Sequence, residues 1–321
     1  MTYPFDPELA AALSLMAEVD ITDLTAARAA QAAELKAALA EADERGTEIS
    51  HTHAPGGNGG PPVPLRIYRP EGATGPLPAL LSLHGGGFVL GSPDADHELS
   101  LRLCRELPAV VVAVDYRLAP EHRFPAALDD CYAALCWLAA HATGLGADPA
   151  RIGIWGDSAG GGLAAGVALL ARDRSGPAIR LQHLHSPALD DRLATLSARR
   201  FTDTPVWNRR NAWLSWQRYL GPGVPGSSGV TGYAAPARSA DLAGLPPAYI
   251  AVMEFDPLHD EGVDFAGALA AAGVRVDLRS YPGTFHGCAA VAHSAVARRI
   301  TDEALGALRE GLGPLPEGSR R

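Results

Sequence analysis

The pentapeptide Gly-Asp-Ser-Ala-Gly at 156–160 follows the apolar run 152–155 and precedes a stretch of small residues. This order predicts a buried strand, a sharp turn and the start of a helix, with Ser158 at the apex of the turn. Glycines flank the serine because so tight a turn has no room for larger side chains. The chain contains 35 glycines, so the pentapeptide alone is a moderate signal and its context must decide.

A second glycine-rich segment, His-Gly-Gly-Gly-Phe at 84–88, follows the apolar run 79–83. Consecutive glycines at a strand end expose backbone N–H groups that no side chain covers. Such donors can stabilise the oxyanion of a tetrahedral intermediate, together with the N–H of the residue after a nucleophilic serine. The alternative is a flexible turn. We predict an oxyanion hole formed by the N–H groups of Gly86, Gly87 and Ala159, with Gly85 as a nearby further candidate.

Two more residues complete a chemical pattern with Ser158. Asp256 follows the apolar run 248–253, and His286 lies in a glycine-flanked loop after the alternating segment 274–278. Active sites of open α/β sheets lie at the carboxyl ends of strands, where all three residues are expected. Serine, an orienting carboxylate and a histidine base form a catalytic triad. The alternatives are a helix-capping role for the aspartate and a structural role for the histidine.

Other polar residues near these motifs are interpreted as structural. Asp260 and Glu261 fall in the first turn of a predicted helix, where acidic side chains favour the helix dipole. Arg117 and Glu121 are expected to support the loop beneath the oxyanion hole.

Strands alternate with helices along most of the chain. Strands are predicted at 65–69, 79–83, 110–115, 152–155, 179–185, 248–253 and 274–278, and helices notably at 126–140, 159–172 and 261–272. This alternation predicts an α/β fold with a mostly parallel central sheet and helices on both faces. The Gly- and Pro-rich segment 51–62 predicts a loop. The last strand would be an exposed sheet edge that needs cover.

Two segments lie outside the alternation: an N-terminal segment, 1–46, and an insertion, 189–233. Helical spacing predicts helices at 7–18 and 21–45. We expect both segments to form a helical cap over a core made of 47–188 and 234–321. A dimerisation or solubility arm is the alternative for the N-terminal segment.

The insertion carries three of the five tryptophans, Trp207, Trp213 and Trp216. The spacing of Trp213, Trp216 and Tyr219 predicts that they lie along one side of a helix. They form either an apolar wall over a substrate or the packing of the cap on the core, and both need the same residues. Phe88 and the three tryptophans are the candidate substrate-binding residues.

Bulk properties limit the possible partners. A net charge of −9 argues against binding to nucleic acid or an anionic membrane surface. The N-terminus has no basic start followed by an apolar core, and no run is long enough to span a membrane. We expect reduced thiols in a cytoplasmic protein from the four cysteines, Cys104, Cys131, Cys136 and Cys288. His183 and His185 share a strand face without a visible third ligand, so no metal is expected.

The combined motifs resemble the hormone-sensitive-lipase-like branch of the α/β-hydrolases. They are H-G-G-G-F at 84–88, D-Y-R-L-A-P-E at 115–121, G-D-S-A-G-G at 156–161, D-P-L-x-D-E at 256–261 and G-x-x-H-G at 283–287. Within that branch, 187–193 and 283–287 are similar to bacterial heroin esterase and related acetyl esterases. His259 stands where arginine is usual, and Cys288 stands where phenylalanine is usual. Neither departure removes a catalytic group.

The resemblance implies an α/β-hydrolase fold with a helical cap and a serine carboxylesterase that hydrolyses short acyl esters without a cofactor. It also suggests a homodimer. An amidase or peptidase using the same triad is one alternative. A non-catalytic binding protein on the same fold is another, although such proteins lack the histidine that this chain has at position 286.

Overall fold

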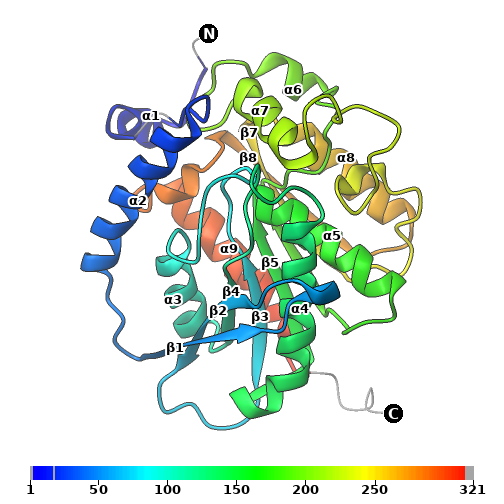
Figure 1. Cartoon of the computed structure of the whole chain (residues 1–321). Coiled ribbons are helices and arrows are strands. Elements are labelled where there is room, and N and C mark those ends of the chain that lie inside the picture. The colour runs from blue at the N-terminus through cyan, green and yellow to red at the C-terminus, as the bar shows by residue number, and fades with distance from the viewer. Residues whose placement is uncertain (1–2, 17–18, 315–321) are drawn as a thin grey trace.

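The computed structural model describes residues 3–16 and 19–314 (Figure 1). Within these ranges eight strands form one sheet in the order β1-β2-β4-β3-β5-β6-β7-β8. They are β1 (Thr47–Ala54), β2 (Val63–Pro70), β3 (Leu77–Leu83), β4 (Val110–Val114), β5 (Ala147–Asp157), β6 (Leu181–His185), β7 (Ala248–Phe255) and β8 (Val276–Phe285). Pairing is antiparallel for β1–β2 and β2–β4 and parallel from β4 onward, so the predicted mostly parallel sheet is confirmed.

Helices cover both faces of the sheet. They are α1 (Pro7–Ala12), α2 (Leu24–Glu41), α3 (His97–Glu106), α4 (Ala126–His141), α5 (Ala159–Asp173), α6 (Leu196–Arg200), α7 (Arg209–Leu220), α8 (His259–Ala271) and α9 (Ala295–Leu312). Helices α4, α5 and α8 pack on one face, and α3 and α9 pack on the other. The strands between these layers are apolar on both sides; every residue of β4, Val-Val-Val-Ala-Val, is buried.

The sequence missed one strand and misjudged several boundaries. Residues 47–54 form β1, although 51–62 was expected to be a loop. This strand, Thr-Glu-Ile-Ser-His-Thr-His-Ala, is mostly polar because it lies at the sheet edge, where pairing with β2 rather than burial holds it in place. At the other edge, β8 runs to Phe285, well past the predicted end. The last strand is therefore an edge, as expected.

The N-terminal segment forms shorter helices than predicted. Helix α1 ends at Ala12 and one 3-10 turn, Leu13–Leu15, follows; the rest of the predicted helix 7–18 includes positions outside the described residues. Helix α2 begins after Asp23, whose carboxylate accepts the N–H of Ala26 at 3.0 Å. Every residue of α2 is described and none is buried, because its alanine-rich sequence has no broad apolar stripe.

The insertion packs through its aromatic residues. The rings of Phe88 and Tyr219 stack at 4.0 Å between centroids, and Trp216 lies 5.2 Å from Phe88. Trp216 is 1% exposed, whereas Trp213 is 52% exposed. The expectation that Trp213 shares the buried side of the helix is wrong: six residues of helix separate it from Tyr219 by about 120° around the axis. Trp216 therefore packs the cap on the core, and Trp213 lies outside that aromatic cluster.

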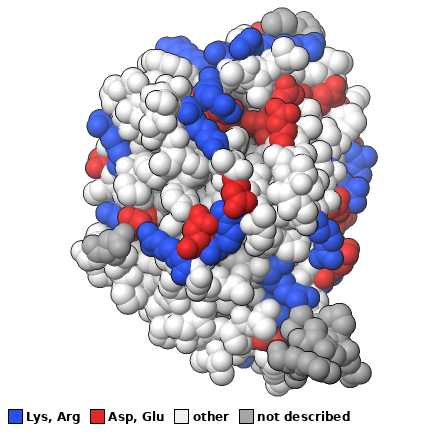
Figure 2. All heavy atoms as spheres, turned by 90° about the vertical axis from the view of Figure 1, so that its right-hand side faces the viewer, with Lys and Arg blue, Asp and Glu red and all other residues white. Residues whose placement is uncertain are grey.

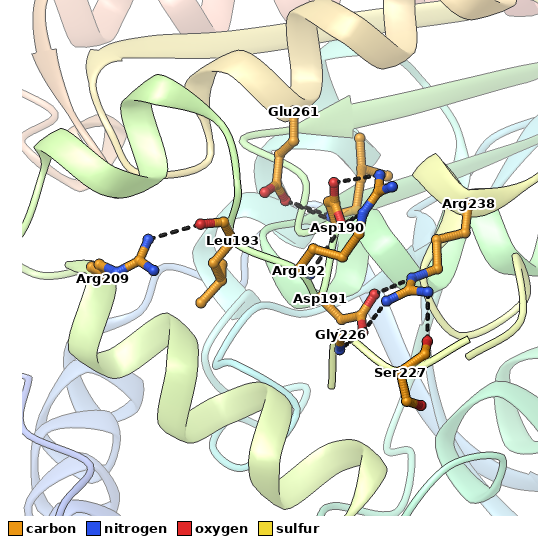
Figure 3. A network of polar contacts seen from close by, with 10 residues as sticks. Asp190, Asp191, Arg192, Leu193, Arg209, Gly226, Ser227, Arg238 and Glu261 are labelled. Atoms are coloured by element: carbon orange, nitrogen blue, oxygen red, sulfur yellow. Dashed lines mark hydrogen bonds and ion pairs between the residues drawn. The ribbon is translucent and has the colours of Figure 1, made fainter. Parts of the chain in front are cut away.

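Two carboxylates of α8 anchor the insertion to the core, and the buried one, Glu261, is drawn in Figure 3. Glu261 Oε1 accepts the N–H groups of Leu189 at 2.6 Å and Asp190 at 3.3 Å, and burial raises the pKa of Glu261. Asp260 Oδ2 accepts the N–H of Ser197 at 2.8 Å. Asp260 and Glu261 lie in the first turn of α8 as predicted, but both also bind the backbone of the insertion, so an interpretation as helix-dipole charges alone is incomplete.

The two segments outside the core lie at the same end of the sheet. Figure 1 shows α1, α2, α6 and α7 grouped around the end to which β5 and β7 point. On the face drawn in Figure 2, acidic and basic side chains are interspersed, and neither sign covers the surface. None of the described helices is long and apolar enough to cross a lipid bilayer. The division of the chain into a cap and a two-part core stays a prediction.

Candidate active site

Ser158 lies between β5 and α5 in a strained backbone conformation. Its φ is +53°, and its N–H donates to the carbonyl of His185 at 2.8 Å. A β-carbon on Gly160 would lie 2.0 Å from the carbonyl oxygen of Leu83, and one on Gly156 would lie 2.1 Å from that of Gly160. Only glycine fits at both positions, so the close approach of strand and helix holds the serine at the apex.

The structure brings Ser158, His286 and Asp256 together from three strand ends. His286 Nε2 lies 3.0 Å from Ser158 Oγ, and His286 Nδ1 lies 2.6 Å from Asp256 Oδ2. All three residues are buried. The other carboxylate oxygen, Asp256 Oδ1, accepts the N–H of Leu258 at 2.9 Å. Asp256 therefore binds the backbone just before α8 through one carboxylate oxygen and orients His286 through the other.

The charge of Asp256 changes the protonation of His286. Burial disfavours the charged imidazole, but the negative charge and hydrogen bond of Asp256 outweigh burial and raise the pKa of His286. Asp157 adds a smaller effect in the same direction. This is the electrostatic arrangement of a base that must become a stable imidazolium during reaction.

The glycine turn after β3 lies beside Ser158, since a β-carbon on Gly85 would lie 3.6 Å from that of Ser158. The carbonyl of Gly86 accepts the N–H groups of Val89 at 3.1 Å and Leu90 at 2.8 Å. Ser215 of α7 donates its hydroxyl to the carbonyl of Gly87 at 2.7 Å. The amides of Gly86 and Gly87 donate to no other described residue. Ala159 is the first residue of α5, where an N–H has no partner within the helix.

Neighbouring residues support this turn only in part as expected. The Tyr116 hydroxyl donates to the carbonyl of His84 at 2.7 Å. Arg117 forms a two-point ion pair with Asp130 of α4, at 2.8 Å for both contacts, rather than contacting the turn. Glu121 pairs instead with Arg28 of α2 at 2.7 Å, a contact that the sequence did not predict.

Comparison with known proteins agrees with this geometry. A model of the family described as the α/β-hydrolase fold matches residues 80–290, from the strand before the glycine turn to just beyond His286. The chain belongs to the α/β-hydrolase family.

Individual members of the α/β-hydrolase family resemble the chain over most of its length. Carboxylesterase NlhH of Mycobacterium tuberculosis is 41% identical over 257 residues, which cover 78% of this chain and 79% of the relative. Ethyl acetate hydrolase of Pseudomonas putida is 38% identical over 227 residues, 70% of each chain. The solved structure of bacterial heroin esterase is 49% identical, covers 97% of this chain and 99% of its own, and has a TM-score of 0.95. The resemblance found in the motifs is confirmed.

In this α/β-hydrolase, Trp207 is the predicted aromatic residue that reaches the candidate site. Its ring centroid lies 5.9 Å from that of His286, and a β-carbon on Gly87 would lie 2.4 Å from its ring. Val206 has a φ of +62°, and the N–H of Trp207 donates to the carbonyl of Pro205 at 2.6 Å. A β-branched residue in this region is strained, and the strained turn aims Trp207 at the glycine turn.

The two departures from the family pattern have structural partners. His259 Nδ1 lies 2.8 Å from Asp260 Oδ1 and its Nε2 lies 3.2 Å from Ser280 Oγ. Cys288 is buried, with its Sγ 3.8 Å from the sulfur of Met253, and burial raises its pKa to about 12. No cluster of three or more potential metal ligands occurs among the described residues of this hydrolase.

Proposed function

We propose that this α/β-hydrolase is a serine carboxylesterase that cleaves esters of short acyl groups through an acyl-enzyme. The observation that carries the proposal is the continuous contact from Ser158 through His286 to Asp256, at 3.0 and 2.6 Å. A buried serine with a histidine base and an orienting carboxylate is the arrangement that nucleophilic acyl transfer requires.

In the first half of the reaction, Ser158 Oγ attacks the ester carbonyl carbon and His286 Nε2 takes the hydroxyl proton. The N–H groups of Gly86, Gly87 and Ala159 donate to the developing oxyanion. When the tetrahedral intermediate collapses, the bond to the alcohol oxygen breaks and the imidazolium returns its proton to that oxygen. Asp256 stabilises the imidazolium while it carries the proton.

In the second half, a water molecule attacks the acyl-enzyme, with His286 again as base. The carboxylic acid leaves and Ser158 regains its proton. Every proton and electron pair in this sequence is accounted for by the triad, the ester and one water molecule, so no cofactor or metal takes part.

Three observations support a preference for short acyl groups. The ring of Trp207 lies against Gly87 of the glycine turn and fills space beside the proposed oxyanion hole. One relative that is 38% identical is named an ethyl acetate hydrolase, whose substrate carries a two-carbon acyl group. In addition, Trp216 and Phe88 are already packed against one another and offer no open wall.

The test is hydrolysis of p-nitrophenyl acetate, butyrate, octanoate and palmitate by the wild-type chain and by Ser158→Ala. Ser158→Ala should lower kcat by about 10⁶-fold, the loss measured for other serine triads. Ser228→Ala, in an exposed loop, is the matched control and should behave as wild type. A Ser158→Ala variant as active as wild type would refute the mechanism. Preference for palmitate would refute only the short-acyl part.

A further inference from the structure

Arg28 of α2 reaches from the N-terminal segment to the glycine turn. Its Nε donates to the carbonyl of Val89 at 3.0 Å, and its Nη2 donates to the carbonyl of Ala119 at 2.9 Å. The same guanidinium pairs with both oxygens of Glu121, at 2.7 and 2.9 Å. One side chain therefore holds two separate loops of the core.

Gln31, one helical turn further along α2, makes a second contact with the same loop. Its Oε1 accepts the N–H of Gly91 at 2.9 Å. Residues three apart lie on neighbouring positions of a helix surface, so Arg28 and Gln31 present a donor and an acceptor side by side. Arg28 donates to the carbonyl of Val89 and Gln31 accepts the N–H of Gly91, so both neighbours of Leu90 are hydrogen-bonded to α2.

These contacts fall on the segment that directly follows the three glycines, and the first of these glycines lies beside the nucleophile, since a β-carbon on Gly85 would lie 3.6 Å from that of Ser158. The carbonyl of Gly86 accepts the N–H groups of Val89 and Leu90, so Val89 and Gly86 are joined within one turn. The N–H of Ala119 donates to the carbonyl of Phe88 at 2.9 Å, which ties the second loop held by Arg28 to the same turn. The Gly86 carbonyl shares a peptide plane with the Gly87 N–H, so the hydrogen bonds from Val89 and Leu90 help to fix the direction of that N–H.

The energetics favour positioning over simple attachment of a helix. No residue of α2 is buried, and the apolar residues of α2 that pack against the core, Leu24 and Ala27, are only partly buried. The Arg28 and Glu121 side chains are 33% and 54% exposed, and exposed ion pairs contribute only about 0–1 kcal/mol to stability. Transition-state stabilisation by backbone donors, in contrast, depends steeply on where those donors point.

We propose that Arg28 and Gln31 are positioning residues that hold the glycine turn in the geometry of an oxyanion hole. Neither touches the substrate; both act through the backbone of 86–91. The inference rests on the proposed esterase function and adds a requirement to it: the N-terminal segment must be docked for the transition state to be fully stabilised.

The kinetic test compares Arg28→Met with Lys36→Met, which removes a cation from an exposed position of the same helix. Losing one oxyanion donor outright costs about 10²–10³ in kcat, so a donor pair that is only misdirected should cost less, on the order of 10-fold. KM for p-nitrophenyl acetate should stay within about 2-fold, because substrate binding is not the step affected. Arg28→Lys, which can satisfy fewer of the acceptors, should fall between the two.

A second pair of variants isolates the acceptor at position 31. Gln31→Leu removes it, whereas Gln31→Glu keeps an oxygen that can accept the N–H of Gly91. Only Gln31→Leu should lower kcat. For each variant the inhibition constant of a trifluoromethyl ketone, which forms a tetrahedral adduct with the serine, should rise in proportion to the loss in kcat/KM. A loss of folding alone would lower the active fraction and leave that constant unchanged.

Hydrogen exchange keeps the inference testable apart from activity. Amides of Val89, Leu90 and Gly91 should exchange at least about 5-fold faster in Arg28→Met and Gln31→Leu than in Lys36→Met. Unchanged exchange and unchanged kcat would overturn the positioning role. If the wild-type chain hydrolyses no ester, the proposed function fails, and the exchange rates still decide whether these residues hold the turn.

Discussion

The two segments outside the alternating core contact it in opposite ways. The insertion buries aromatic side chains, and its Asp191 forms a two-point ion pair with Arg238 at 2.5 and 2.8 Å (Figure 3). The N-terminal helix α2 buries no residue and holds the core through Arg28 and Gln31. The insertion adds one side of α7 to the hydrophobic core. The N-terminal segment adds Leu9, Ala12 and Ile21 to it, but its longest helix, α2, is attached at the surface.

This difference separates stability from catalytic geometry. Buried apolar area dominates the free energy of unfolding, and removing one partner of a buried ion pair is strongly destabilising, whereas exposed polar contacts add little. Exposed polar contacts can still fix the direction of a peptide plane. We therefore expect substitutions of the buried Trp216 ring and of the Asp191–Arg238 pair to act mainly on stability, and those of Arg28 and Gln31 in α2 mainly on kcat.

The largest effect is expected at Trp216. Trp216→Ala should lower the free energy of unfolding by about 3–5 kcal/mol, because it removes a fully buried ring that packs against both Phe88 and Tyr219. Trp213→Ala, three residues earlier on α7, should change it by no more than about 0.5 kcal/mol. Urea unfolding of both variants measures the difference. Equal losses of unfolding free energy in the two variants would mean that α7 is not held on the core by the side that carries Trp216.

A smaller effect is expected from the ion pairs of the two segments. Asp191 and Arg238 are 0% and 12% exposed, and Arg238 also donates to the carbonyl of Ser227 at 2.7 Å. Arg238→Met leaves a buried carboxylate with one remaining partner, the amide of Gly226 at 2.7 Å. This should cost about 3 kcal/mol, at the low end for a broken buried pair.

The counterpart in the N-terminal segment is Arg28→Met, which should cost less than about 1 kcal/mol because its partner is largely solvated. Denaturant midpoints for the two methionine variants give the comparison directly. If Arg28→Met destabilised the chain as much as Arg238→Met, the N-terminal segment would have to be counted as part of the core.

The sequence predicted the central sheet well because its signals are local. Apolar runs bounded by glycine or charged residues marked each parallel strand, and Asp256 and His286 followed two of them. The edge strand β1 was missed because its residues are polar and its stability comes from pairing with a distant segment. No local pattern reports such a partner.

The site was predictable in its chemistry and less so in its surroundings. Ser158, Asp256 and His286 were identifiable from residue type and position at strand ends, and the structure brings them into contact. The strained turn at Val206 and the hydrogen bond from Arg28 to Val89 could not be identified from the sequence, because both depend on how the segments pack. The error at Trp213 was avoidable, since helical geometry alone places it away from Tyr219.

The smallest expected effect is on the pH dependence of activity, and it bears on whether α2 acts through the turn or through the triad. His286 must be neutral to accept a proton, and its pKa is raised above the usual 6.5. The acid limb of kcat/KM, which reports the free enzyme, should therefore lie above pH 6.5. The titratable groups that act on His286 are Asp256 and, more weakly, Asp157. Buried His185 stays neutral there, since burial lowers its pKa.

Asp256→Asn removes the charge that opposes burial, so the acid limb should move to lower pH while kcat falls steeply. Arg28→Met changes none of these groups. If α2 positions only the oxyanion turn, the variant should lose kcat at every pH and keep the wild-type acid limb. If Arg28→Met shifted the acid limb of kcat/KM, the N-terminal segment would act on His286 and Asp256. The division of roles between the two segments would then be refuted.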